Sequence, residues 1–202
     1  MHEHPIIDSE WAAGRDDETV VRRLYSVELP FAFENERGKY FDVIESCSRF
    51  LNLSVLDIKV AGSAQTGYSF HSQRPFDPGN SDLDLAVISE RYFERLLRAA
   101  QKAALPNPDT LERPRRNAFP ELHGQSAYNT FMENVAFYGR ILPHHLPDCD
   151  ERRELFRVSR KLSNIHSSMF KEVTIAIYLS QYFFERRQRP NLGIYRQARK
   201  GQ

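Results

Sequence analysis

The chain has few of the residues that mark disulfide-rich or membrane proteins. The 202 residues include only two cysteines, Cys47 and Cys149, which are too few for a disulfide framework. The chain also lacks a C-x-x-C pair of the kind that indicates a zinc site. No stretch approaches the roughly 18 apolar residues that a membrane span needs. The first residues, MHEHPIIDSEWAAGRDDE, lack the basic flank and apolar run of a secretory signal. We therefore expect a reduced, cytoplasmic protein with no membrane segment.

A strong charge of one sign is also absent. Lys and Arg number 28 against 27 Asp and Glu, for a formal net charge of +1, so the whole chain is not drawn to polyanions by its charge. Basic residues do cluster after residue 112 and after residue 185. Such clusters are usually solvated surface. Binding of nucleic acid through them without any nucleotide is therefore the weaker interpretation.

Hydrophobic periodicity along the chain predicts an α/β (α+β) domain. We expect an N-terminal arm or helix over 1–36, a domain over 37–190 with an insertion or loop at 105–125, and a basic tail over 191–202. Within the domain, the pattern predicts strands at LDIKVAGS (56–63), DLDLAVIS (82–89) and VTIAIYL (173–179). Helices are predicted at 39–53, after Ser89, at 128–141, 151–169 and 180–187, and the segment 64–80 is predicted to be a loop.

Two acidic residues stand inside the second apolar strand. Residues two apart in a strand point to the same face, so Asp82 and Asp84 project together while Leu83, Leu85 and Val87 face the core. Two neighbouring carboxylates repel each other unless a cation lies between them. Magnesium favours one or two carboxylates together with phosphate oxygens. The strand therefore predicts a magnesium site.

The first strand ends in a Gly-Ser pair. Gly62 lets a ligand approach the backbone closely, and the hydroxyl of Ser63 can donate a hydrogen bond to it. Free backbone N–H groups in such a turn favour an anion such as phosphate. A phosphate-binding turn beside a metal-binding aspartate pair predicts a nucleoside triphosphate (NTP) site and phosphoryl or nucleotidyl transfer with one or two metal ions.

The motifs AGSAQTG and SDLDLAVIS together resemble those of the nucleotidyltransferase superfamily with the polymerase-β-like fold. The resemblance covers about thirty residues closely and implies a small mixed sheet flanked by helices. It also implies that Gly62 and Ser63 hold the triphosphate, with Thr66 as a weaker candidate, and that Asp82 and Asp84 bind magnesium. Members of the family transfer a nucleoside monophosphate from an NTP to an acceptor on nucleic acid, protein or a small molecule.

The chain departs from this family in two respects. The spacer before Asp82 is longer than usual, and it contains His71 and Arg74, which are near enough in sequence to reach a substrate. The family also carries a third carboxylate on a later strand, whereas VTIAIYL contains no acid. Glu172, immediately before that strand, is the only positional candidate. A binding site without that acid would have little means of deprotonating the acceptor.

Several alternatives remain at this stage. In one alternative, the aspartates pair with nearby Lys or Arg on an exposed strand, and the Gly-Ser pair is an ordinary turn. His144 and His145 stand near Asp148 and Asp150, but adjacent residues rarely converge on one metal ion, so a loop is favoured there.

Two functions follow: a magnesium-dependent nucleotidyltransferase, or a catalytically reduced NTP-binding or regulatory module that acts with a protein partner. A partner could also supply the surface that encloses the acceptor.

Overall fold

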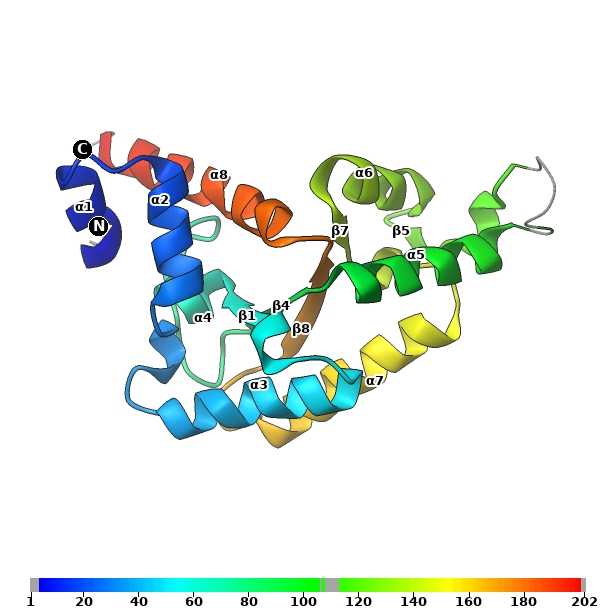
Figure 1. Cartoon of the computed structure of the whole chain (residues 1–202), viewed down its shortest axis with the longest axis horizontal. Coiled ribbons are helices and arrows are strands. Elements are labelled where there is room, and N and C mark those ends of the chain that lie inside the picture. Colours follow the sequence, from blue (N-terminus) through cyan, green and yellow to red (C-terminus); the bar gives the residue numbers. More distant parts are fainter. Residues whose placement is uncertain (1–3, 106, 108–112, 201–202) are drawn as a thin grey trace.

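One four-stranded mixed sheet organises the molecule (Figure 1). The structure, a computed structural model, describes residues 4–105, 107 and 113–200. The strand order is β1-β4-β8-β7, in which β1 is antiparallel to β4, β4 is parallel to β8, and β7 is antiparallel to β8. The bounds are Ile58–Ala61 for β1, Leu83–Ile88 for β4, Arg140–Ile141 for β7 and Val173–Tyr178 for β8. The predicted α+β class and the three longer strands are confirmed.

Helices α3 (Arg37–Leu51), α5 (Glu90–Ala104) and α7 (Asp150–Ile165) pack on one face of the sheet. Strand alternation sends Leu83, Leu85 and Val87 into this core, where each is at most 1% exposed. Ser89 is the N-cap residue of α5, as predicted, and its hydroxyl accepts a hydrogen bond from the backbone N–H of Tyr92. In Figure 1, α3 and α7 run side by side beneath the sheet.

The opposite face of the sheet is covered by both ends of the chain. Helices α1 (Pro5–Ala12) and α2 (Asp17–Arg22), and the turn η1 (Arg23–Val27), form a second core with α8 (Gln181–Lys200). The backbone N–H of His4 donates to the hydroxyl of Tyr195 at 2.9 Å, and Figure 1 shows α1 beside the end of α8. The N-terminal segment predicted as an arm or helix is therefore helical and packed.

Helix α8 is much longer than predicted. The sequence indicated a helix ending at Arg187 and a basic tail over 191–202, yet the helix continues through Pro190 to Lys200. Leu192 and Tyr195 are buried in the second core at 0% and 3% exposure. Packing of these side chains outweighs the helix-breaking tendency of a proline.

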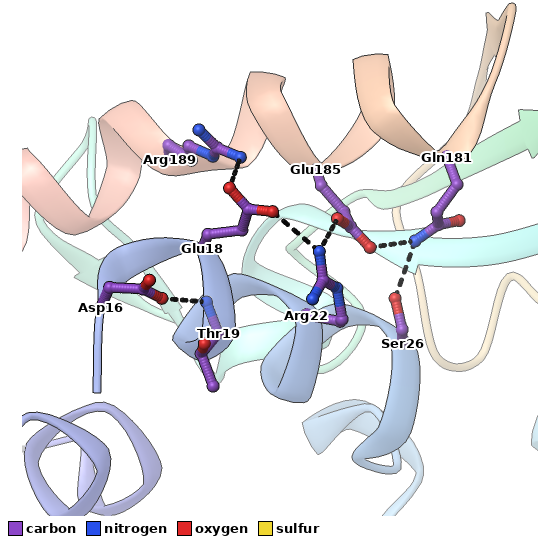
Figure 2. A network of polar contacts seen from close by, with 8 residues as sticks. All are labelled: Asp16, Glu18, Thr19, Arg22, Ser26, Gln181, Glu185 and Arg189. Atoms are coloured by element: carbon purple, nitrogen blue, oxygen red, sulfur yellow. Dashed lines mark hydrogen bonds and ion pairs between the residues drawn. The ribbon is translucent and has the colours of Figure 1, made fainter. Parts of the chain in front are cut away.

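A polar network joins α2 to α8 (Figure 2). Glu18 accepts from Arg22 at 2.8 Å and from Arg189 at 2.6 Å. Glu185, which is 6% exposed, accepts from Gln181 at 2.8 Å and forms an ion pair with Arg22 at 3.6 Å. Gln181 also donates to the hydroxyl of Ser26. The network fixes the N-terminal helices against α8, which places residues of both on the same side of the sheet as Asp84.

Short elements connect these layers. Helix α4 (Gly62–Thr66) takes the last two residues of the strand predicted over 56–63 and continues into the segment 64–80 that was predicted to be a loop. That segment also contains the paired strands β2 (Tyr68–Ser69) and β3 (Arg74–Pro75), so the loop prediction is only partly right. The predicted helix at 128–141 is α6 (Tyr128–Tyr138), which ends at Gly139 before β7. The remaining elements are η2 (Phe31–Phe33), η3 (Val55–Asp57), η4 (Arg116–Ala118), β5 (Glu121–Leu122), β6 (Gln125–Ser126) and η5 (Pro143–His145).

The predicted insertion at 105–125 holds η4 and the β5–β6 pair, but its residues 106 and 108–112 lie outside the described residues. No helix in the described part of the chain is long and apolar enough to cross a membrane.

Candidate functional site

The two aspartates lie on the face of the sheet that α2 and α8 cover. In the sheet register, Asp84 pairs with Ala61 of β1 on one side and with Thr174 of β8 on the other. The Thr174 hydroxyl donates to Asp84 Oδ1 at 2.6 Å. Asp82 stands one residue before β4, exposed, and both aspartates line one cavity. Gly62 and Ser63, which the sequence predicts to bind phosphate, line the same cavity.

Gly62 directly contacts Asp84. Its φ is +62°, and a Cβ at this position would lie 2.2 Å from Asp84 Oδ2. A left-handed backbone and the absence of a side chain are both needed for the end of β1 to lie against this carboxylate. The Gly-Ser pair is therefore shaped around Asp84, which an ordinary strand-ending turn would not require.

The other residues of α4 have different roles. Ser63 lines the cavity, and its hydroxyl forms no hydrogen bond with any described residue. Thr66 also lines the cavity, but its hydroxyl donates to the carbonyls of Tyr68 at 2.7 Å and Gly62 at 3.2 Å. The structure therefore leaves Ser63 available to a ligand and uses Thr66 to hold the turn.

The cavity has a volume of about 630 Å³, which is within the range of small-molecule sites. His71 and Arg74, from the long spacer, are exposed and line it. Tyr25 of the second core and Asn191 of α8 also line the cavity, and their side chains lie 3.5 Å apart. The cavity around the aspartates is thus lined by residues of the long spacer, the sheet and the two ends of the chain.

The aspartate pair has no ion-pair partner in the part of the chain that the structure describes. Among the described residues, no Lys, Arg or His side chain forms an ion pair with Asp82 or Asp84. Burial raises the pKa of Asp84, the hydrogen bond from Thr174 opposes this rise, and the charge of Asp82 adds to it. The alternative that the aspartates pair with a nearby Lys or Arg therefore does not hold.

The predicted third acid lies next to this cavity. Glu172 precedes β8, its carbonyl accepts from the backbone N–H of Leu83 at 2.8 Å, and its side chain is exposed. Glu172 and Thr174 both line a neighbouring cavity that excludes the two aspartates. Within the described residues, no three His, Cys, Asp or Glu side chains are grouped closely enough to hold a metal ion. The residue opposite Asp84 on β8 is a threonine.

His144 and His145 are not brought together with the acids near them in sequence. The buried His145 lies 3.4 Å from the amide nitrogen of Asn134, whereas Asp148 and Asp150 both form ion pairs with Arg153. Burial lowers the pKa of His145 to about 4, so its imidazole is neutral at pH 7.

Sequence reasoning missed Thr174, Tyr25 and Asn191, among other residues of the site. Thr174 had a signal, because it lies two residues after Glu172 and so on the same side of a strand. Tyr25 and Asn191 had none, since each reaches the cavity only through the packing of α8 against η1 and the sheet.

No family model matches the chain, and no curated protein or solved structure is significantly similar to it. What the chain binds must therefore be argued from its own residues.

Proposed function

We propose that the protein is a magnesium-dependent nucleotidyltransferase that transfers a nucleoside monophosphate from an NTP to an acceptor hydroxyl. One observation carries the proposal: two carboxylates that form no ion pair with any described residue line one cavity of about 630 Å³ together with the Gly-Ser turn. A half-buried carboxylate whose pKa is raised by burial and by its neighbour destabilises the fold in its charged form. A bound cation would remove that cost.

Asp82 and Asp84 fit a magnesium ion that arrives with a nucleotide. Magnesium is commonly held by one or two carboxylates, with substrate phosphates and water completing its octahedral shell. The ion would neutralise charge on the triphosphate and polarise its phosphorus. Thr174 would orient Asp84 by holding one of its oxygens.

The remaining residues of the cavity suit the triphosphate. The hydroxyl of Ser63, which forms no hydrogen bond with any described residue, would donate to a phosphate oxygen. The cationic Arg74 would approach the triphosphate from the β2–β3 pair. Thr66 would keep the turn in shape through its two bonds to backbone carbonyls.

In the transfer step, the acceptor oxygen attacks the α-phosphorus as the bond from that phosphorus to the bridging oxygen breaks. Pyrophosphate leaves with the electron pair. The hydroxyl proton goes to the carboxylate of Glu172, which lies beside Thr174 in the neighbouring cavity.

A second candidate function is favoured by Thr174. A hydroxyl, and no acid, stands opposite Asp84, and Glu172 is outside the cavity that holds the aspartates. Two carboxylates alone bind a catalytic ion weakly. In this alternative the chain binds an NTP without transfer and acts through a protein partner.

Two measurements separate these functions. Magnesium with a non-hydrolysable NTP should raise the melting temperature of the wild-type protein, because a ligand that binds only the folded state stabilises it. The shift should vanish in Asp82→Asn/Asp84→Asn. An unchanged shift in that variant would place the nucleotide elsewhere and would end the proposal.

Transfer is then tested with labelled NTP and candidate acceptors. In the proposed enzyme, Glu172→Gln should slow transfer by about 10²–10⁴-fold while leaving the NTP-dependent melting shift intact, as expected for a group that acts mainly in the transition state. Equal transfer by Glu172→Gln and wild type would exclude this role for Glu172. A nucleotide-induced melting shift with no transfer to any acceptor would favour the binding module.

A further inference from the structure

A second cavity, of about 380 Å³, opens at the edge of the sheet beside Thr174. The edge is uncovered there because β7 pairs only with Ile177 and Tyr178, at the far end of β8. At the near end of β8, helix α7 contacts the strand in place of a pairing strand. The hydroxyl of Ser159 donates to the carbonyl of Val173, and the backbone N–H of Val173 donates to the hydroxyl of Ser163 at 2.8 Å. The cavity is thus built on a strand and a helix fixed to each other.

Two basic side chains without an ion pair in the described part of the chain line this cavity, together with the carboxylate of Glu172. Arg160 and Lys171 are exposed, line the cavity, and form no ion pair with any described residue. Arg157, one turn away on α7, is likewise exposed and forms none within the described chain. Arg153, by contrast, is engaged by two aspartates. These three basic side chains in and beside the cavity outnumber the one described carboxylate that lines it, that of Glu172, and an excess of positive charge suits an anionic ligand.

An aromatic ring stands among these cations. Phe156 lines the cavity, is 39% exposed, and has the guanidinium of Arg152 at 5.3 Å from its ring centroid. An exposed aromatic side chain among unpaired cations is the combination by which proteins hold single-stranded nucleic acid, with bases stacked and phosphates neutralised.

Thr174 connects this cavity to the aspartates. It lines the cavity and donates to Asp84 Oδ1 at 2.6 Å, so a ligand placed here is separated from the aspartate pair by one side chain. We propose that this cavity binds the end of a single-stranded nucleic acid, which serves as the acceptor. The proposal rests on the proposed function, and it names the acceptor class of that site.

The test measures binding of a fluorescent single-stranded oligonucleotide of about eight nucleotides by anisotropy over a range of salt concentrations. Arg160→Gln/Lys171→Gln should weaken binding by about tenfold or more, and should flatten the plot of log affinity against log salt by about 1.4 for two lost phosphate contacts. Phe156→Ala should weaken binding by about fivefold or more through lost stacking.

Arg91→Gln/Lys102→Gln is the matched control, because it removes one Arg and one Lys, both exposed and without an ion pair in the described chain, from the neighbouring helix α5. It should leave affinity within about twofold of wild type. Equal loss in both double variants, or no binding by the wild type, would overturn the inference.

Failure of the proposed function would look different. Asp82→Asn/Asp84→Asn should lose the NTP-dependent melting shift and keep oligonucleotide binding, while Arg160→Gln/Lys171→Gln should do the reverse. A wild-type protein that shows no NTP-dependent shift refutes the nucleotide site whatever the oligonucleotide does. The acceptor site alone is refuted if the NTP-dependent shift is normal but replacing Arg160 and Lys171 leaves oligonucleotide binding unchanged. Transfer only to a protein or a small molecule would also refute the acceptor site.

Discussion

Replacing Gly62 with alanine tests the contact on which the site is built. A non-glycine residue in the left-handed region costs about 1–2 kcal/mol. At Gly62 the new Cβ would also lie 2.2 Å from Asp84 Oδ2, and overpacking of this kind costs typically about 1–3 kcal/mol. Gly62→Ala should therefore lower the free energy of unfolding by about 2–5 kcal/mol, measured by urea denaturation.

Gly14 offers a matched control, because its φ is +74° and a Cβ there would meet nothing within 4 Å. Gly14→Ala should cost only the backbone term of about 1–2 kcal/mol. Removing the carboxylate with Asp84→Ala should bring the cost of Gly62→Ala down to the same value, which gives a coupling energy of about 1–3 kcal/mol. Equal costs for Gly62→Ala with and without Asp84 would refute the contact.

Two further predictions concern charge. Burial raises the pKa of Asp84 above its ordinary 3.8, so the charged form of this carboxyl disfavours folding. The stability of the wild type relative to Asp84→Asn should therefore fall as pH rises from 3.8 through the raised pKa, and then stay level. A relative stability that rises with pH would show the opposite pKa shift. Arg22→Leu should lower the free energy of unfolding by about 1–3 kcal/mol in denaturation experiments, because the buried Glu185 loses its cation. The control Arg98→Leu breaks an exposed ion pair on α5 and should lower it by only about 0.3–0.5 kcal/mol. Similar losses in the two variants would mean that the α2–α8 network adds no stability.

Much of the sheet and its main core was predictable because local pattern determines them. The alternation in DLDLAVIS sets which side chains of β4 face the core, and the apolar spacing after Ser89 defines the buried face of α5. The same alternation placed Asp82 and Asp84 together on the other side. These features depend on residues a few positions apart, so a single sequence is enough to read them.

The rest depends on packing between distant segments. Tyr25 and Asn191 reach the cavity because α8 continues past Pro190 and packs against the N-terminal helices. No local pattern indicates that the two ends of the chain meet. The pairing of Asp84 with Thr174 likewise depends on the register between β4 and β8, which are 90 residues apart in sequence.

The most direct test of the account is a crystal structure with manganese and a non-hydrolysable NTP, because manganese reports its own position by anomalous scattering. We expect an anomalous peak in contact with Asp82 and Asp84, and phosphate density over Gly62 and Ser63. A nucleotide bound elsewhere, or a metal ion that contacts neither aspartate, would contradict it.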